Sequence, residues 1–413
     1  MSRKRILVLS YLYPNGEYPN HGIFVHNRIK ALSRNCDMRV INPIPWFPFA
    51  SLFARYRNFD RIPAREIIDG IEVFHPRYFI IPRYFKFLDA VTYGISTLVH
   101  LFKYHRRWIR QVALIDLHWT YPDLPVGKIL SQWLKRPFLV TLRGKEALNL
   151  FVSADPGATE EKEYSLRSVL TRYVLRKAHG VIGLSRELID LARKAGVDRE
   201  KTRVIINGVD TDRFHFFPQD QALKKLKLKP GPKRILSVGS LTYRKGFDRI
   251  LKALAELRDG GHKDVKLHII GSVGPEAPYA RELEARCRQL GLEDVVSFEG
   301  QVPNDELIHW YNGADLFCLA SRGEGSPNVL AEALACGCPC VATAVGAVPH
   351  MIRDKGQGRV VPNRDAGLAA AMEAVLDQEN NRKQNATFMG QYHWDWCADN
   401  VMTVYDELLR KTT

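Results

Sequence analysis

The segment Arg322-Gly-Glu-Gly-Ser-Pro-Asn-Val-Leu-Ala-Glu332 combines two carboxylates with a predicted helix start. It follows the apolar run Leu316 to Ala320, which predicts a buried strand. Ser326 is expected at the N-cap of the helix and Pro327 at its first position. The peptide N–H groups of Gly325 to Val329 would then be free, and a helix start with unpaired donors suits a pyrophosphate.

Glu324 precedes this predicted helix, and Glu332 lies about a turn and a half inside it. Two carboxylates so placed could accept hydrogen bonds from different hydroxyl groups of one ligand, for example a sugar and a ribose. Taken by itself, the segment favours a plainer interpretation, in which the glutamates are a helix-terminus charge and part of a solvated face.

Other candidate residues carry weaker signals. His118 and Asp123 follow a predicted strand and could face an acceptor, although a lone His or Asp there is more often structural. Asp210-Thr-Asp212 has the form of a metal-binding Asp-x-Asp, but it lies in the segment between the two expected domains. Cys336, Cys338 and Cys340 lack C-x-x-C ligand spacing, so no metal site is expected. No Gly-x-Gly-x-x-Gly follows the first strand, which argues against a dinucleotide dehydrogenase.

Two series of alternating strands and helices position these residues. The first begins with the strand Lys4 to Ser10 and the helix Ile23 to Leu32, and predicts a doubly wound α/β domain. A linker is expected around His215 to Pro218 and the basic stretch Lys224 to Lys233. Further strands are expected at Met38 to Ile41, Ala113 to Leu117, Phe138 to Leu142, Gly180 to Leu184, Arg234 to Val238, Val265 to Ile270, Val295 to Glu299 and Pro339 to Thr343.

The helices of the second series complete another parallel α/β domain. They are expected at Phe247 to Asp259, Ala280 to Leu290, Asn304 to Asn312, Pro327 to Cys336 and Asp365 to Leu376, and a last helix at Trp394 to Leu409. The predicted domains are residues 1–208, 209–390 and a C-terminal helical segment, 391–413. Tandem sheets of this kind predict a cleft that receives loops from the carboxyl ends of both sets of strands.

Composition sets the class of protein. The 413 residues are enough for two or three domains at roughly 150 residues each, with 46% hydrophobic and 25% charged residues. Seven cysteines without framework spacing favour a reducing compartment, and no signal peptide or membrane-spanning run is visible, so a cytoplasmic protein is expected. The net charge of +15 fits anionic lipid or phosphate-bearing substrates, and no nucleic-acid motif accompanies it.

Several segments together resemble glycosyltransferase family 4 (group 1), the retaining enzymes with the GT-B fold. They occur in the family's order over Val181 to Leu376, about half the chain. With this resemblance, the plainer interpretation of the two glutamates loses most of its weight. The segments are Val204-Ile-Ile-Asn-Gly-Val-Asp210, Val238-Gly-Ser-Leu-Thr-Tyr-Arg-Lys-Gly-Phe247, Phe298-Glu-Gly-Gln-Val302, Glu324-x7-Glu332 and Ala333-Leu-Ala-Cys-Gly-Cys-Pro-Cys-Val-Ala342.

The first domain resembles members of the family that build surface polysaccharides, including the teichuronic-acid type. This likeness rests on Asn20-His-Gly-Ile-Phe-Val25, Pro43-Ile-Pro-Trp46, Pro76-Arg-Tyr78 and Thr141-Leu-Arg-Gly144. It implies a saccharide or polyprenyl-linked acceptor, and a C-terminal helix that packs back on the first domain.

The resemblance implies a role for each matching residue. Glu324 is expected to bond the donor sugar near the reacting centre, Glu332 the ribose hydroxyls, and Lys245 the pyrophosphate. Arg143 is expected to act as an electrostatic clamp, because a guanidinium cannot accept a proton as a base does. Further donor contacts are implied for Gly22, Ser240, Arg244, Gly300, Val302, Gly325, Ser326, Pro327, Asn328 and Val329.

Three positions depart from the family's pattern. Ser240 stands where the family commonly has an arginine on the phosphates, and the adjacent Arg244 is a candidate replacement. Arg143 stands where a histidine is common. The usual Gly-Gly-x-Pro-Glu becomes Gly346-Ala-Val-Pro-His350, for which the sequence offers no interpretation.

Residues 51–111 are rich in arginine and aromatic side chains, which suits either an anionic membrane surface or core packing with a solvated basic face. The residues concerned are Arg55, Arg57, Arg61, Arg65, Arg77, Tyr78, Phe79, Arg83, Tyr84, Phe85, Lys86, Phe87, Leu98, Leu101, Phe102, Lys103, Arg106, Arg107, Trp108, Ile109 and Arg110.

The sequence thus predicts a cofactor-free, metal-independent hexosyl- or N-acetylhexosaminyltransferase that uses a nucleotide sugar, with UDP favoured and GDP as the alternative. The resemblance implies that the anomeric configuration is retained, with the acceptor hydroxyl attacking from the leaving-group face and the departing phosphate taking its proton. Two other functions stay open: a retaining disaccharide synthase or phosphorylase acting on soluble acceptors, and a non-catalytic nucleotide-sugar-binding protein, for which the departures at Ser240 and Arg143 speak.

Overall fold

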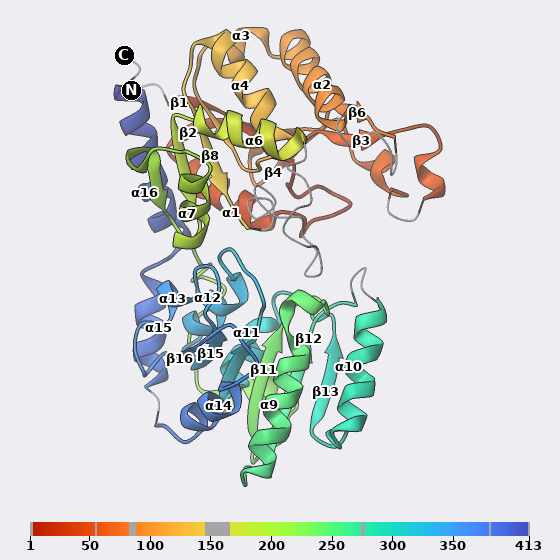
Figure 1. Cartoon of the computed structure of the whole chain (residues 1–413), viewed down its shortest axis with the longest axis vertical. Coiled ribbons are helices and arrows are strands. Elements are labelled where there is room, and N and C mark those ends of the chain that lie inside the picture. Colours follow the sequence, from red (N-terminus) through yellow and green to blue (C-terminus); the bar gives the residue numbers. More distant parts are fainter. Residues whose placement is uncertain are drawn as a thin grey trace. The chain divides into compact units, whose positions relative to one another are not determined.

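A computed structural model describes residues 3–53, 56–81, 88–144, 166–273, 277–379 and 381–411 (Figure 1). The chain divides into two compact units. Unit 1 comprises Met1–Asn207 and Trp394–Thr413, and unit 2 comprises Gly208–His393. The division after residue 207 lies one residue from the boundary expected from the sequence, and the C-terminal segment joins unit 1 from residue 394.

Unit 1 is built on an eight-stranded sheet with the order β10-β9-β8-β7-β1-β2-β5-β4, in which all pairs are parallel except β4 with β5. A separate parallel pair is formed by β3 and β6. The strands are β1 Lys4–Leu9, β2 Cys36–Ile41, β3 Ile44–Trp46, β4 Arg65–Ile68, β5 Ile71–Phe74, β6 Arg77–Phe79, β7 Val112–Leu117, β8 Phe138–Leu142, β9 Gly180–Gly183 and β10 Thr202–Val204.

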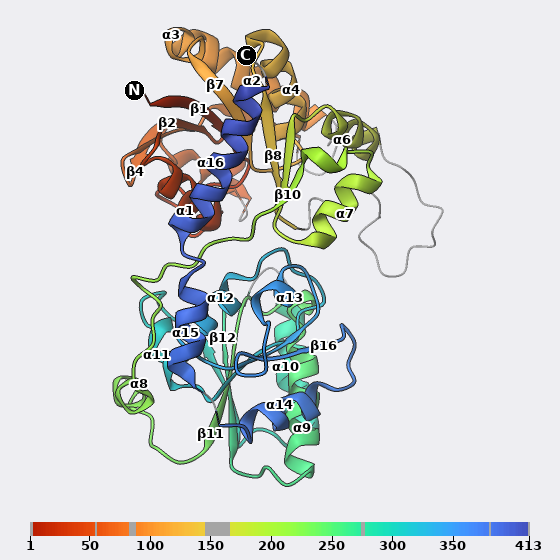
Figure 2. The same ribbon diagram turned by 90° about the vertical axis from the view of Figure 1, so that its left-hand side faces the viewer.

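Alternate residues of each strand face opposite sides of the unit 1 sheet, so both sides carry a core. Leu7 and Leu9 of β1 belong to a cluster covered by α2 Leu88–Tyr104, α4 Asp123–Leu134, α6 Leu166–Arg176 and α7 Arg186–Lys194. Ile6 and Val8 belong to a cluster covered by α1 Ile23–Leu32 and α16 Trp394–Arg410. The last helix of the chain therefore completes the first unit, as Figure 2 shows.

Unit 2 is built on a fully parallel six-stranded sheet with the order β13-β12-β11-β14-β15-β16. Parallel neighbours require crossover connections, and helices supply them. The strands are β11 Lys233–Val238, β12 Val265–Ile270, β13 Val296–Gly300, β14 Leu316–Leu319, β15 Cys340–Thr343 and β16 Gly358–Val361. The helices are α8 Gln219–Leu226, α9 Phe247–Asp259, α10 Ala277–Gln289, α11 Leu307–Gly313, α12 Asn328–Ala335, α13 Val348–Met351, α14 Leu368–Leu376 and α15 Arg382–Gly390.

The linker expected between the domains was wrong in part. Residues 219–226 form the helix α8, which buries Ala222 and Leu223 and exposes Lys224 and Lys225. Lysine has a good helix propensity, so a basic stretch with apolar residues on one side can be helical. The side chain of Gln219 holds this helix by donating to the carbonyl of Gly313 at 3.0 Å.

Among the described residues, no helix combines the length and the apolar character that crossing a bilayer requires.

Candidate functional site

The strand order of unit 2 reverses direction between β11 and β14. From β11 the strand order continues through β12 to β13 on one side of the sheet. From β14 it continues through β15 to β16 on the other side. In open parallel sheets, ligands bind beyond the carboxyl ends of the strands at such a reversal. The loops there are residues 239–246 after β11 and residues 320–327 after β14, which carry the main predicted donor residues.

Two cations from the first loop meet one carboxylate from the second. The Lys245 ammonium lies 2.7 Å from Oε1 of Glu324, and Nη1 of Arg244 lies 3.1 Å from its Oε2. Ser321 also donates to Oε1, at 2.8 Å. Burial alone would raise the pKa of Glu324, but Lys245 and Arg244 overcome it and hold that pKa below its usual value. Glu324 is therefore an ionised acceptor at neutral pH.

Two glycines bring the backbones of these loops together. Gly246 has φ 69°, and a Cβ there would lie 2.0 Å from the carbonyl oxygen of Ala320. Gly346 has φ 54°, and its Cβ would lie 2.4 Å from the carbonyl oxygens of Glu324 and Gly325. Both positions need glycine, because the left-handed conformation and the close approach each exclude a side chain. The segment from Gly346 thus supports the backbone of the Glu324 loop, which the sequence alone did not explain.

An ion pair absent from the sequence interpretation ties the same loops together. Arg322 donates to both oxygens of Asp248, at 2.8 and 2.6 Å, and its guanidinium lies 3.8 Å from the ring centre of Tyr243. Tyr279 donates to Asp248 Oδ1 at 2.7 Å. Burial opposes ionisation of Asp248, but the bonds from Arg322 and Tyr279 lower its pKa. The motifs of the sequence analysis assign no contact to this pair, whose members lie 74 residues apart.

The helix after the second loop begins one residue later than expected. Pro327 occupies the N-cap of α12, and the helix runs from Asn328, so placing Ser326 at the cap was wrong. The fixed φ of proline fits this boundary at −71°. Within the described residues, the amide hydrogens of Gly325 and Val329 meet no protein acceptor. The helix start therefore offers donors and a positive dipole end to an anion.

Glu332 lies on α12 and accepts a hydrogen bond from the Tyr311 hydroxyl of α11 at 2.8 Å. Burial raises the pKa of Glu332 to about 7, although the Tyr311 bond opposes the change. The Tyr311 ring is fully buried and packs edge-to-face on Phe214 at 5.8 Å. Tyr311 was not foreseen, because a tyrosine inside a predicted helix carries no motif.

Three more predicted donor residues lie on loops at the same edge of the sheet. Ser240 is exposed and lies two residues after Val238, the last residue of β11. Gly300 ends β13 with φ 71°, and its carbonyl accepts from the amide of Gly271 at 2.8 Å. Val302 follows two residues later and is half-buried. Their contacts with a donor stay predictions.

In unit 1, the predicted residues His118 and Arg143 lie together in a buried cluster. Arg143 Nη2 donates to His118 Nδ1 at 2.6 Å, so Nε2 carries the ring hydrogen and donates to Asp116 at 3.0 Å. Tyr405 of α16 donates to the same carboxylate oxygen at 2.6 Å. Burial lowers the pKa of His118 to about 4, with Asp116 opposing and Arg143 adding to the shift. His118 is thus a neutral support for Arg143.

Asp123 and Gly22 also make contacts within unit 1. Asp123 is fully buried, and its oxygens accept from the Tyr93 hydroxyl at 2.6 Å and the Tyr11 amide at 3.1 Å. These contacts favour the structural interpretation, and acceptor binding by Asp123 stays a prediction. Gly22 has φ 75°, and a Cβ there would lie 2.7 Å from the carbonyl carbon of Leu12. The packing of the protein backbone therefore requires glycine at this position whether or not a ligand approaches it.

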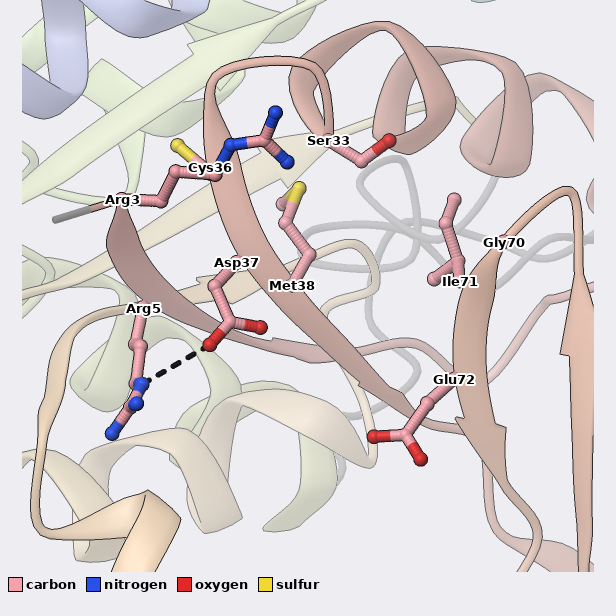
Figure 3. A pocket seen from close by; sticks show the side chains of 9 residues that line it. All are labelled: Arg3, Arg5, Ser33, Cys36, Asp37, Met38, Gly70, Ile71 and Glu72. Carbon is pink, nitrogen blue, oxygen red and sulfur yellow. Dashed lines mark hydrogen bonds and ion pairs between the residues drawn. The ribbon is translucent and has the colours of Figure 1, made fainter.

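A cavity of about 580 Å³ opens at the amino ends of β1 and β2. Its lining includes Arg5 and Asp37, whose side chains pair at 3.0 Å, and Glu72 of β5 (Figure 3). The predicted residues of unit 1 lie at the carboxyl ends of its strands. The cavity lies at the opposite end of the sheet. This cavity is therefore not the predicted site.

Segment 51–111 divides between core and surface. Leu101, Trp108, Ile109 and Tyr78 are buried in the unit 1 core, so their aromatic and apolar character serves packing. Phe79, Phe102, Lys103, Arg106, Arg107 and Arg110 are exposed. Arg55, Arg83, Tyr84, Phe85, Lys86 and Phe87 lie outside the described residues.

The patterns that the sequence did not favour as metal sites make contacts within unit 2. Asp210 Oδ1 accepts from the amide of Arg213 at 3.2 Å and so caps a turn. Cys336, Cys338 and Cys340 are buried thiols, and burial raises the pKa of each. Thiols of this kind behave as small apolar side chains.

Known protein families match both units. The model described as Glycosyltransferase Family 4 matches residues 21–213, and the model described as Glycosyl transferases group 1 matches residues 218–388. The chain belongs to the group 1 glycosyltransferases of family 4. The teichuronic acid biosynthesis glycosyltransferase TuaC of Bacillus subtilis (strain 168) is 26% identical over 89% of this chain and 88% of its own length. The D-inositol 3-phosphate glycosyltransferase of Geodermatophilus obscurus is 33% identical, but over only 54% of this chain and 50% of that enzyme.

Solved structures share the architecture of both units. Sucrose-phosphate synthase from Thermosynechococcus elongatus has a TM-score of 0.78 over 99% of this chain and 100% of its own, at 21% identity. The Anabaena protein HepE in complex with UDP has a TM-score of 0.70 over 98% and 100%, at 18% identity. The predicted α/β class with two Rossmann-like parallel-sheet domains, the GT-B fold, is confirmed.

Proposed function

We propose that this glycosyltransferase moves a hexosyl or N-acetylhexosaminyl group from a UDP-sugar to a saccharide or polyprenyl-linked acceptor in surface polysaccharide or glycolipid synthesis. GDP-sugars are the alternative donors. The single observation that carries the proposal is the gathering of Lys245, Arg244 and Glu324 beside the start of α12, at the strand-order reversal of unit 2. The likeness to TuaC over most of the chain supports the acceptor class.

The charges suit departure of a nucleoside diphosphate. The ammonium of Lys245 has three donors, and one directed at Glu324 leaves two for a phosphate. Together with the Arg244 guanidinium and the amides at the start of α12, it would stabilise the negative charge that develops as the sugar–phosphate bond breaks. These groups can neutralise a diphosphate without a metal ion, so we propose a metal-independent reaction.

We propose that the anomeric configuration is retained, as in the family that the chain resembles, and that no covalent bond to a protein side chain forms on the way. The acceptor oxygen forms the new bond to the anomeric carbon on the face from which the diphosphate leaves. The acceptor proton passes to the departing phosphate oxygen, so no further base is needed. Glu324, held ionised by Lys245 and Arg244, would accept hydrogen bonds from the sugar hydroxyls and orient the ring.

A thermal-shift screen tests the donor proposal. UDP-, GDP-, ADP- and dTDP-sugars are compared on the wild type and on Glu332→Ala. A ligand present at a hundredfold excess over its Kd adds about 2.7 kcal/mol of stability. We expect the UDP series to raise the Tm of the wild type, and the variant to lose most of that response. A folded wild type that responds to no nucleotide sugar would overturn the placement of the donor site.

We further propose a cytoplasmic location at the inner face of the membrane, where a lipid-linked acceptor would be available. A strongly basic chain with exposed apolar side chains in unit 1 supports this.

A further inference from the structure

Helix α2 is apolar on its outer surface as well as on its inner one. Its inner side buries Tyr93, Gly94, Thr97 and Leu101. The outer side exposes Val91, Ile95 and Val99 to 53%, 58% and 57%, and extends to Leu88 and Phe102 at the two ends. These positions are spaced by three or four residues, so they form one stripe along the helix. A surface helix normally presents polar residues there.

The stripe continues onto two neighbouring helices. Phe102 of α2 packs edge-to-face on Trp133 of α4, with ring centres 4.4 Å apart, and Ile129 lies one turn earlier on α4. Lys128 of α4 lies over the ring of Tyr173 of α6, 5.2 Å from its centre. The α2–α4–α6 face is defined by its exposed apolar side chains, and the helices can be followed in Figures 1 and 2. The exposed apolar side chains of the face are Leu88, Val91, Ile95, Val99, Phe102, Ile129, Trp133, Val169, Leu170 and Tyr173.

A contiguous apolar area of this kind on a soluble domain marks a binding surface. Its charge identifies the partner. Residues 88–144 and 166–177 contain only three acidic side chains, and two of them, Asp116 and Asp123, are buried. The exposed basic residues on these helices or close to their ends in the chain are Lys103, Arg106, Arg107, Arg110, Lys135, Arg136, Arg176 and Lys177.

We propose that the α2–α4–α6 face of unit 1 lies on an anionic lipid bilayer. The apolar side chains enter the boundary between headgroups and acyl chains, and the surrounding cations contact lipid phosphates. Trp133 and Tyr173 suit this depth, because their rings combine an apolar body with a polar group. A second copy of this chain fits the face poorly, since it would bring two basic rims together.

The proposed function supplies only the purpose of this membrane contact, which is access to a lipid-linked acceptor. The contact itself follows from side chains within unit 1. The proposed face extends beyond segment 51–111, because α4 and α6 lie outside that segment and part of it is buried core.

Vesicle sedimentation of the full chain tests the proposal. We compare phosphatidylcholine vesicles with vesicles containing 30 mol%, that is about one third, phosphatidylglycerol, and expect binding to the anionic vesicles alone, weakened by salt. Arg106→Gln with Arg107→Gln should weaken binding about 30-fold, since each cation near an anionic surface contributes about a factor of five. Ile95→Gln with Val99→Gln should weaken it by a similar factor.

Matched controls remove equivalent side chains elsewhere. Ile67→Gln with Val204→Gln alters exposed apolar residues away from the face, and Lys224→Gln with Lys225→Gln removes two exposed cations of unit 2. Both controls should bind vesicles as the wild type does. Equal losses in the controls, equal binding to neutral and anionic vesicles, or unaltered binding of the Ile95 and Val99 double variant would each overturn the proposal.

The outcome is separate from that of the donor experiment. The face variants lie in unit 1, and the donor residues Lys245, Glu324 and Glu332 in unit 2, so every face variant should keep the wild-type thermal response to UDP-sugar. Vesicle binding without any nucleotide-sugar response would leave the face standing and the proposed function refuted. A donor response without vesicle binding would refute the face alone. A wild type that dimerises in solution, and a face variant that does not, would assign the face to a second copy and overturn the lipid proposal.

Discussion

Replacing Glu332 by glutamine is expected to stabilise the free protein above neutral pH and to weaken donor binding. Glu332 is partly buried between α12 and α11, and its protein hydrogen-bond donor is the Tyr311 hydroxyl. Burial raises the pKa of this carboxyl to about 7, so the ionised form is poorly accommodated without a ligand. Glutamine keeps the size of the side chain and an oxygen that can accept from Tyr311, but it carries no charge.

The size of the effect follows from the pKa. A rise from 4.5 to about 7, at about 1.4 kcal/mol per unit, corresponds to about 3.5 kcal/mol. Because the side chain is partly exposed, solvent screening reduces the expectation to about 1–2 kcal/mol. The folded state holds the proton more tightly than the unfolded chain, so wild-type stability falls as pH rises from about 4.5 to about 7.

Urea unfolding of wild type and Glu332→Gln from pH 4 to pH 8.5 measures this difference. The two proteins should have nearly equal stability at pH 4, and the variant should exceed the wild type by about 1–2 kcal/mol at pH 8. In the presence of UDP-sugar the order should reverse, since an amide replaces the carboxylate that accepts from the ribose hydroxyls. A variant that is less stable at pH 8, or a difference that does not change with pH, would refute this reasoning.

Three further substitutions probe the site in unit 2. Lys245→Gln removes the ammonium beside Glu324 and should lower kcat about 10²–10³-fold in a donor-cleavage assay with acceptor; activity within a few-fold of wild type would contradict its role. Asp248→Asn deprives Arg322 of its carboxylate and should cost about 2 kcal/mol in urea unfolding, whereas an unchanged midpoint would show that the pair is dispensable. Gly246→Ala places a Cβ 2.0 Å from a backbone oxygen and should lower stability by about 2 kcal/mol or more; a wild-type Tm would show that the loop can move away.

Much of the architecture could be predicted because buried parallel strands are continuous apolar runs. The strands Phe138–Leu142 and Val265–Ile270 and the helix Phe247–Asp259 have the predicted bounds. Family motifs also identified Lys245 and Glu324, which lie 79 residues apart in the chain and meet at 2.7 Å. Family motifs can identify residues that meet in space, whereas hydrophobic periodicity indicates only the local helix or strand.

Other features could not be predicted, because they depend on tertiary contacts between positions without a local signal. The Arg322–Asp248 pair and the Tyr311–Glu332 bond join separate elements, and nothing near them in the chain indicates the partner. The short strands β4, β10 and β16 were missed because each lies at a sheet edge and has few fully buried residues. The apolar outer stripe of α2 was obscured because the inner side of the same helix is apolar too.

The C-terminal helix has a consequence for how the chain acquires its structure during synthesis. Helix α16 covers the side of the unit 1 sheet that carries Ile6, Val8 and Leu114, and it follows unit 2 in the chain. Unit 2 is a continuous stretch that ends at His393, so all of its sequence has been made before this helix. Domains usually mature in the order of translation. Here the unit that begins first is finished last, and its uncovered sheet must wait for the whole of unit 2 to be translated.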